Sequence, residues 1–315
     1  MVETRSSRRT YCARSYLFYS VLQTTLLLLA LALSGCSSTN PYYNPAKPHH
    51  RPYGFENNYG QEPVKSLWTV IGWRVSSWLK DIPPLPTTPT PELVPDLGAI
   101  EANSKAGARM QPALTWVVHA TALVQAGGLN VLTDPQFSER ASPLSWLGPR
   151  RLYAPAISLK QLPRIDVVLI SHSHYDHLDV ASVTALNAQS GGPPLFIVPL
   201  GIKPWLAALG INNTVELDWW DTHRLGGTEF VLTPVQHWSS RKPWDRKETL
   251  WGGFAVLAPE FHWFFSGDTG YSKDFADIAA RLAPRQPQGF DLALLPIGCY
   301  EPRWFMKEQH VNPDE

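Results

Sequence analysis

The chain of 315 residues has few cysteines and no excess of either charge, and each shortage excludes a class of protein. Only three cysteines are present, too few for the disulfide framework of a small secreted domain. Cys12 and Cys36 fall in a leader-like stretch, so only Cys299 remains in the body of the chain. We expect Cys299 to be a small apolar residue after a strand, in preference to a metal ligand or a catalytic thiol.

Basic and acidic residues number 27 each, so the formal net charge is zero. Removing residues 1–35 takes away four arginines and Glu3, which leaves about three net negative charges. A chain without a basic surplus lacks the electrostatic footprint of a nucleic-acid-binding protein. Its apolar content of 44% is ample for a hydrophobic core. We therefore expect a globular protein with no nucleic-acid partner.

The first 36 residues have the composition of an export signal. Four arginines precede an apolar run over 16–33, and Leu33-Ser34-Gly35-Cys36 follows it. A basic segment, an apolar segment and a small-residue cleavage site make up a signal peptide, and the last four residues resemble the lipobox of bacterial lipoproteins. We expect cleavage after residue 35, lipidation of Cys36 and a place in the bacterial cell envelope, on the outer membrane facing the periplasm. The alternative is an uncleaved anchor, for which the apolar run is short.

Residues 36–112 are expected to form a proline-rich tether and N-terminal arm. Prolines recur through 41–52 and again through 83–95, and proline cannot donate to a strand ladder. The pattern predicts a tether over 37–62, a short amphipathic helix over 64–79 and an extended arm after it. His49 and His50 lie in the tether, where we expect no special role for them.

From residue 113 onward, short apolar runs alternate with turn signals. They predict strands at 114–118, 123–126, 130–135, 165–170, 195–198, 215–217, 229–235, 253–257, 263–265 and 292–295. Helices are predicted at 180–189, 204–209 and 273–282. Strands in meander order, mixed with helical crossovers, predict an α/β protein of two sheets packed face to face with helices outside.

Three histidines and two aspartates are concentrated directly after the apolar strand 165–170, in Ser171-His172-Ser173-His174-Tyr175-Asp176-His177-Leu178-Asp179. Side chains alternate in an extended chain, so His172 and His174 share one side, and a turn brings Asp176 and His177 to a neighbouring point. Imidazole and carboxylate are ligands that suit zinc. We interpret the run as the ligand set of a metal pair. The alternative is a solvated polar turn, against which the buried strand before it argues.

Four further segments each place a polar group at a predicted strand end, and they contain Asp134, His237, Asp268 and His310. In order and type they match the pattern of the metallo-β-lactamase superfamily. The details most resemble its N-acylphosphatidylethanolamine-hydrolysing phospholipase D group, in Trp116-Val117-Val118-His119-Ala120-Thr121, Leu132-Thr133-Asp134-Pro135, Leu250-Trp251-Gly252-Gly253-Phe254 and His310-Val311-Asn312-Pro313-Asp314-Glu315. Val118 departs from the pattern, because that group has glycine there. The resemblance covers residues 113–315 and implies a four-layer αββα sandwich.

The resemblance implies two zinc sites that share one carboxylate. The implied ligands are His172, His174 and His237 for one ion, Asp176 and His177 for the other, and Asp268 as the bridge between them. Zinc ions of this kind are the expected cofactor.

The resemblance also implies supporting and substrate-facing residues. Asp134 would hold the ligand loop from behind. His119 would either share that supporting role or be a core histidine bonded to backbone. His310 would face the substrate as a phosphate binder or proton donor, and together with Asp176 it is an expected catalytic residue.

One departure concerns the C-terminus. The family has another histidine ligand, in a His-Trp-Gly segment that would lie beyond Glu315, where this chain ends. We therefore expect the hydrolase domain at 113–315 to be C-terminally truncated, with a second zinc site that lacks one ligand.

The predicted function is that of a zinc-dependent phosphodiesterase of phospholipase D type. Its expected substrate is N-acylphosphatidylethanolamine or a related lipid head group, which a lipid anchor would keep beside the site. One alternative is a lactonase or general phosphodiesterase with a soluble periplasmic substrate. Another is a zinc-binding envelope lipoprotein without catalytic activity.

Overall fold

The computed structural model describes residues 39–60, 65–79 and 93–315. The predicted leader with Cys36, and the proline-rich stretch 80–92, lie outside the described residues. Among the residues that are described, no helix has both the length and the apolar character that crossing a bilayer requires.

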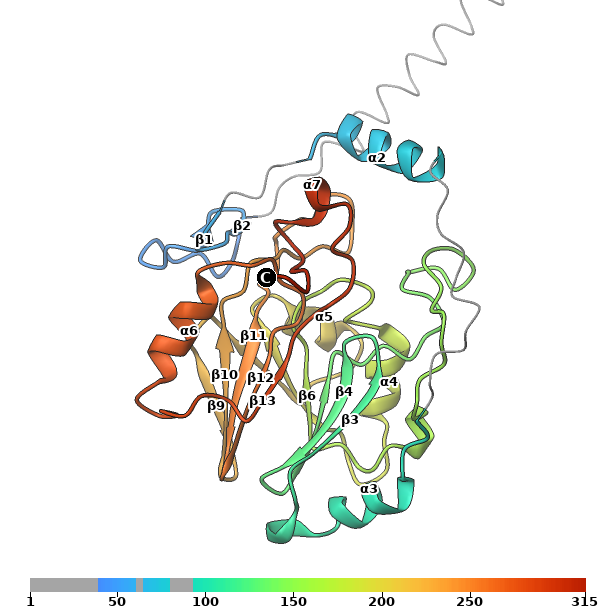
Figure 1. Ribbon diagram of the computed structural model, residues 1–315, viewed down its shortest axis with the longest axis vertical. Coiled ribbons are helices and arrows are strands. Elements are labelled where there is room, and N and C mark those ends of the chain that lie inside the picture. The colour runs from blue at the N-terminus through green and yellow to red at the C-terminus, as the bar shows by residue number, and fades with distance from the viewer. Residues whose placement is uncertain (1–38, 61–64, 80–92) are drawn as a thin grey trace, which may run out of the picture.

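Two β-sheets form the centre of the molecule (Figure 1). The six-stranded sheet has the order β3-β4-β5-β6-β7-β8, with β3 (Ala113–Val118), β4 (Thr121–Ala126), β5 (Leu129–Thr133), β6 (Val167–Leu169), β7 (Leu195–Pro199) and β8 (Thr214–Leu217). The five-stranded sheet has the order β13-β12-β11-β10-β9, with β9 (Thr222–Leu225), β10 (Thr228–Thr233), β11 (Gly253–Ala258), β12 (Phe261–Phe265) and β13 (Leu292–Leu294).

The pairing changes direction within each sheet. Strands β3, β4 and β5 pair antiparallel as a meander, whereas β5 to β8 pair parallel. In the other sheet only β12 and β13 are parallel. Parallel strands need long crossovers, and α4 (Val180–Asn187) and α5 (Ile202–Ala208) supply two of them.

Strand β6 explains why the six-stranded sheet has a layer on each face. Val167 and Leu169 join the core between the two sheets, while Val168 joins the core beneath the helices. All three side chains are fully buried. An apolar run without polar alternation therefore marks a strand that is covered on both sides.

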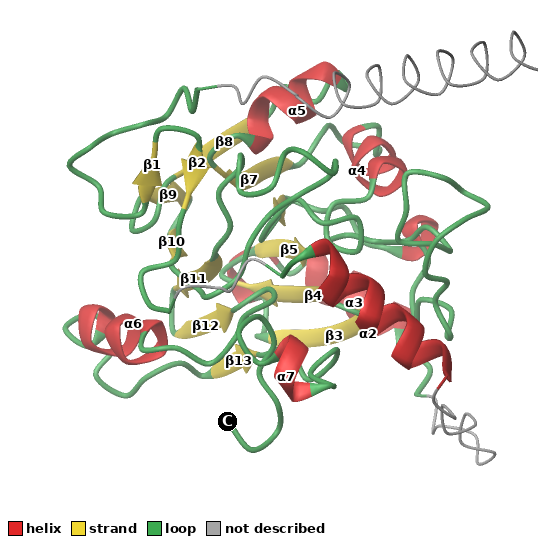
Figure 2. Ribbon diagram, turned by 90° about the horizontal axis from the view of Figure 1, so that it is seen from above, coloured by secondary structure: helices red, strands yellow, loops and turns green. Residues whose placement is uncertain are grey.

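Helices complete the outer layers (Figure 2). Helices α4 and α5 cover the outer face of the six-stranded sheet, and α6 (Asp274–Leu282) packs Ile278 and Leu282 toward the five-stranded sheet. The remaining helical pieces are α2 (Leu67–Leu79), α3 (Leu97–Ser104), α7 (Arg303–Met306) and the short 3-10 turns Gly107–Arg109 and Leu159–Gln161. The prediction of an α/β fold with two packed sheets and outer helices is confirmed.

The structure differs from the predicted tether at residues 39–60. This segment contains the hairpin of β1 (His50–Arg51) and β2 (Gly54–Phe55) and packs on the domain. From here on, the name N-terminal arm refers to residues 39–60 alone. Phe55 is 1% exposed and belongs to the same hydrophobic cluster as Val167 and Leu169. At Gly54, with φ +147°, an added Cβ would lie 2.3 Å from the carbonyl oxygen of Lys247. The prolines correctly indicated a mostly irregular backbone, but the prediction of a free tether is wrong for residues 39–60, because this segment packs on the domain.

Both histidines of the arm are buried against one carboxylate. The Nε2 atoms of His49 and His50 lie 2.7 and 2.9 Å from the two carboxylate oxygens of Asp218, and the ammonium group of Lys47 donates to the same group. Burial raises the pKa of Asp218, but its hydrogen bonds with His49 and Lys47 outweigh burial and hold that pKa below its ordinary value. These two histidines, for which no special role was expected, fasten the arm to the domain.

Candidate metal centre

The candidate site lies where several strands end at the same edge of the two sheets. Parallel strands β5 and β6 deliver Asp134 and the segment 171–179 to that edge. In the other sheet β10 and β12 run in the same direction and deliver His237 and Asp268. Carboxyl ends of strands that run the same way meet at one edge, so groups far apart in sequence converge.

A close approach of backbone joins the two sets of loops. Gly267 has φ +59°, and a Cβ on it would lie 2.4 Å from the Cβ of Ser171. Only glycine tolerates this contact. It allows the loop that carries Asp268 to lie directly beside the loop that begins at Ser171.

Three histidines converge in a first group, with His172 and His237 buried and His174 partly buried. The Nδ1 atom of His174 lies 2.8 Å from Nε2 of His172 and 3.3 Å from Nε2 of His237. Burial lowers the pKa of His172 and of His237 well below the ordinary value, and it lowers the pKa of His174 to about 4. Neutral imidazoles with converging nitrogens are the form in which histidine binds a transition metal.

A second group contains Asp176, His177 and Asp268. The Nε2 atom of His177 lies 3.3 Å from Oδ2 of Asp268 and 3.5 Å from Oδ2 of Asp176, and it is buried without a hydrogen-bond partner. Burial lowers the pKa of His177, but the carboxylates of Asp268 and Asp176 outweigh burial and raise it well above the ordinary value. The two carboxylates thus stabilise positive charge at this point. A divalent cation would compete with the proton for the nitrogen of His177.

Asp268 lies between the two groups. Its Oδ2 is 3.3 Å from Nε2 of His177 and 3.9 Å from Nε2 of His237. The same oxygen is 3.9 Å from Nδ1 of His310, a buried nitrogen without a hydrogen-bond partner. Burial raises the pKa of Asp268, but the charge of His177 outweighs burial and lowers that pKa. A negative oxygen in this position can be shared by two cations.

Asp134 supports the second group from behind. It is fully buried, and its carboxylate accepts hydrogen bonds from the backbone N–H and the hydroxyl group of Ser171, at 2.7 and 2.5 Å. Its Oδ2 also lies 2.7 Å from Nδ1 of His177. A histidine held through one ring nitrogen directs the other one, here Nε2, toward the site. Asp134 is thus placed to hold the ligand loop, and its supporting role stays a prediction.

Asp179 has a structural role. It is the N-cap of α4, where its side chain accepts from the backbone N–H of Ser182. Its carboxylate also accepts from the hydroxyl of Ser138, at 2.8 Å. Asp179, the fifth of the histidines and aspartates in the run 171–179, therefore fixes the helix that follows the site, as N-cap aspartates do.

For His119 the structure excludes one of the two expected roles, and Cys299 differs from expectation. His119 is no core histidine, because 46% of its side chain is exposed, and its Nε2 lies 3.2 Å from Oδ2 of Asp176. The same geometry makes His119, Asp176 and His177 a possible set of cation ligands. Cys299, expected to be a small apolar residue, is exposed and has φ +57°. Although its side chain is accessible to solvent, partial desolvation and the charges of Asp268 and Asp176 raise the pKa of its thiol, so it is a poor nucleophile.

Asn57 is a residue of the site that sequence reasoning missed. Its side-chain amide bonds to both backbone polar groups of His237. An asparagine in a proline-rich segment has no spacing or periodicity that singles it out. A further set of possible ligands, His49 and His50 of the arm with Asp218 of the domain, lies where the arm docks, but Lys47 already supplies a positive charge there.

Comparison with known proteins gives consistent matches. Residues 129–315 match the family model described as a beta-lactamase superfamily domain. N-acyl-phosphatidylethanolamine-hydrolyzing phospholipase D 1 of Caenorhabditis elegans is 41% identical over 64% of this chain and 58% of its own length. The mitochondrial N-acyl-phosphatidylethanolamine-hydrolyzing phospholipase D of Saccharomyces cerevisiae is 33% identical over 83% of this chain and 58% of its own length.

A shorter relative matches over more of its own length. A UPF0173 metal-dependent hydrolase of Rubrobacter xylanophilus is 30% identical over 59% of this chain and 69% of its own length. By contrast, the chain spans little more than half the length of the two phospholipases.

Proposed function

The chain belongs to the metallo-beta-lactamase superfamily of metal-dependent hydrolases, and from this premise we propose that it cleaves a phosphodiester bond in phospholipid head groups, with N-acylphosphatidylethanolamine as the substrate. The observation that carries the proposal is the pair of adjacent ligand groups that share Asp268. Two neighbouring cations suit in-line displacement at phosphorus. The names of the relatives in Caenorhabditis elegans and Saccharomyces cerevisiae support this bond type.

The donor set fits a pair of divalent ions, and we propose zinc. The first ion would be held by His172, His174 and His237, the second by Asp176 and His177, with Asp268 between them. The fit rests on neutral, converging imidazoles in the first group and on an unpartnered buried nitrogen beside two carboxylates in the second. When bound, such a pair acidifies water and neutralises charge on the phosphoryl oxygens.

The protein groups around this centre bind and orient the substrate. His310 faces Asp268 from the side of α7, and burial lowers its pKa, so that it is a neutral imidazole at pH 7. In that form it can donate a hydrogen bond to a phosphoryl oxygen. Asp134 and Asn57 do not reach the substrate and hold His177 and His237 in position.

The exposed aromatic side chains of α2 and α7 support the proposal that the substrate is a membrane lipid. Trp68 on α2 is 80% exposed and Trp304 on α7 is 63% exposed. The two helices lie beside each other (Figure 1), and Trp73 of α2 stacks on Phe305 of α7 with ring centroids 4.7 Å apart. Exposed tryptophans are favoured at the interface between water and lipid. A substrate in a bilayer would approach the centre past these side chains.

We further propose that Cys36 carries a lipid that anchors the protein in the bacterial cell envelope, on the periplasmic face of the outer membrane. The support is the leader composition and the Leu33-Ser34-Gly35-Cys36 segment. Mass spectrometry of the mature N-terminus tests it. A mature protein that begins before Cys36, or at an unmodified Cys36, would contradict the proposal.

The substrate proposal is tested with the 315-residue protein after reconstitution with zinc. N-acylphosphatidylethanolamine in mixed micelles should yield phosphatidate and N-acylethanolamine, measured by mass spectrometry. Asp268→Asn should abolish turnover, because the shared oxygen is lost, whereas Glu56→Gln, an exposed change on the arm, should leave it intact. A panel of lactones and bis-aryl phosphodiesters serves as comparison. Hydrolysis of a lactone with no release of phosphatidate would refute the proposed function.

A further inference from the structure

We propose that Asn57 is a positioning residue that fixes His237 in the metal centre, so that the N-terminal arm is part of the functional site. The inference rests on the proposed role of His237 as a metal ligand. It goes beyond the matched family domain, which begins at residue 129, because Asn57 lies in the arm that precedes it.

One side-chain amide meets both backbone polar groups of His237. The Nδ2 group of Asn57 donates to the carbonyl oxygen of His237 at 3.0 Å, and the N–H of His237 donates to Oδ1 of Asn57 at 3.1 Å. The pair of bonds resembles the contact between two strands, with a side chain in place of the second backbone. It fixes the position and the direction of the peptide that carries the imidazole.

Asn57 is itself fixed from the core. Its Oδ1 accepts a second hydrogen bond, from the indole N–H of Trp251 at 3.1 Å, and Trp251 is fully buried in the hydrophobic core. The same indole N–H also donates to the carbonyl oxygen of Val235, at 2.9 Å. The amide cannot rotate by half a turn without facing this N–H with its own NH2 group, so its orientation is determined.

The imidazole of His237 is held at two points as a result. Its Nδ1 lies 3.1 Å from the carbonyl oxygen of Gln309, which orients the ring, while Asn57 holds the backbone. Nε2 then faces Nδ1 of His174 at 3.3 Å. Groups that orient a metal ligand from outside commonly change metal affinity by a factor of about 10 to 100 when they are removed.

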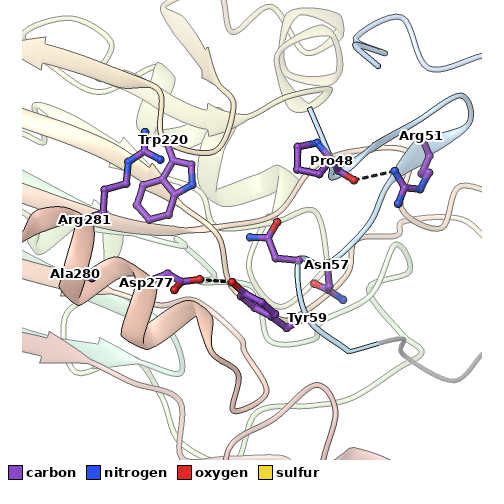
Figure 3. Close-up of a pocket in the computed structure, with 9 residues that line it drawn as sticks. Pro48, Arg51, Asn57, Tyr59, Trp220, Asp277, Ala280 and Arg281 are labelled. Atoms are coloured by element: carbon purple, nitrogen blue, oxygen red, sulfur yellow. Dashed lines mark hydrogen bonds between the residues drawn. The ribbon is translucent and has the colours of Figure 1, made fainter. Parts of the chain in front are cut away.

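The surroundings make Asn57 a clean position to change. Figure 3 shows Asn57 and Tyr59 on the arm, facing Trp220 and Arg281 across a cavity of about 830 Å³ that the arm forms with α6. Asn57 thus has an open cavity on one side, and truncation to alanine removes its hydrogen bonds without emptying a closed core. Loss of packing is therefore a minor part of the effect of Asn57→Ala.

The adjacent asparagine provides a matched control. Asn58 has the same chemistry on the same arm, but its Nδ2 donates to Asp274 of α6, at 3.0 Å, and not to His237. Asn58→Ala therefore loosens the arm without releasing the ligand. A purely structural arm would give the same result for both variants.

The experiment measures zinc affinity by competition with a chromophoric chelator, together with the visible absorption of the cobalt-substituted protein. Asn57→Ala should weaken zinc binding about 10- to 100-fold and change the cobalt spectrum. Asn58→Ala should keep the affinity and spectrum of the unchanged protein. If Asn57→Ala does not fold, Asn57→Asp serves, because it keeps the acceptor oxygen but turns a negative oxygen toward the carbonyl of His237. It should weaken binding as well.

Three results would overturn the inference. Wild-type affinity in Asn57→Ala, with weak binding in His237→Ala, would refute the role of Asn57 alone. Equal weakening in the Asn57 and Asn58 variants would show that the arm acts only through stability. Wild-type affinity in His237→Ala would refute the proposed metal centre, and with it this inference.

Discussion

Asp134 connects the strand that precedes it to the ligand loop of the neighbouring strand through one carboxylate. Its oxygens accept from Ser171 and face Nδ1 of His177. An asparagine has only one acceptor oxygen for these donors. We expect Asp134→Asn to lower zinc affinity at the His177 position about 10- to 100-fold. Metal content after dialysis against a fixed free-zinc concentration measures this.

Asp179→Asn is the control for that change. Asparagine caps helices as well as aspartate does, and Asp179 bonds to Ser182 and Ser138, not to the ligand groups. The control should bind as much zinc as the unchanged protein. Full metal content in Asp134→Asn would contradict the supporting role of Asp134.

Single residues were predictable where chemistry and position agreed. The run 171–179 combines ligand side chains with the end of a buried strand, so its convergence with His237 and Asp268 could be expected. Sequence alone could not tell that His174 would present Nδ1 while His172 and His237 present Nε2, because this depends on side-chain rotation in the fold. Asn57 could not be found, since its partners are backbone atoms, which leave no trace in residue type.

At the scale of elements, the hairpin of β1 and β2 is held by the carboxylate of Asp218. Because the pKa of Asp218 in the folded protein is below its unfolded value, this interaction stabilises the protein above pH 4 and is lost as the pH falls further. Asp218→Asn should cost about 3 kcal/mol of unfolding free energy at pH 7. The difference between the two proteins should shrink toward pH 3, as measured by urea unfolding.

Glu56→Gln is the matched control for Asp218→Asn. Glu56 belongs to the same arm and pairs with Arg51, but both side chains are about half exposed. Exposed pairs contribute less than about 1 kcal/mol. A difference between Asp218→Asn and the unchanged protein that stays constant from pH 7 to pH 3 would argue against a role for the charge.

Elements with strong periodicity were predicted, and weak ones were not. The predicted helix 273–282 matches α6 closely, because its apolar residues recur on one face. Strand β9 has four residues with polar side chains among them and lies at the edge of its sheet. Helix α3 contains Gly98 and only one buried residue, Ile100. Strand β9 is stabilised by pairing with its neighbour, and α3 by the contact of Ile100 with the core. Neither stabilising contact is visible in the local sequence.

At the scale of the whole molecule, the candidate metal centre joins the two sheets. His172, His174 and His177 follow a strand of one sheet, and His237 and Asp268 follow strands of the other. A cation that binds only the folded protein, at a free concentration of about 100 times its dissociation constant, adds about 2.7 kcal/mol to the free energy of unfolding. A chelator should therefore lower the midpoint of thermal unfolding by about 5 °C or more. Circular dichroism with and without the chelator measures this.

The His237→Ala variant is the reference for the chelator experiment. It lacks a proposed ligand, so its unfolding midpoint should respond little to the chelator. An equal response in both proteins would mean that the chelator acts elsewhere.

The fold class followed from the order of strands and helices, because short connections and packed layers leave few arrangements for such a chain. The path of residues 39–60 did not follow. The arm contacts both sheets and α6 through scattered pairs, among them His49 with Asp218 and Asn58 with Asp274. Contacts of this kind have no period that a sequence pattern could reveal.

The long separation between the arm and its partners has a consequence for the order of assembly. Asn57 and His237 are 180 positions apart, and Tyr59 and Asp277 are 218 apart. Since a chain is made from its N-terminus, the arm is synthesised among the first described residues and cannot complete its contacts until residue 277 has been made. The arm that supports His237 therefore waits through the synthesis of 180 positions before its partner in the centre exists.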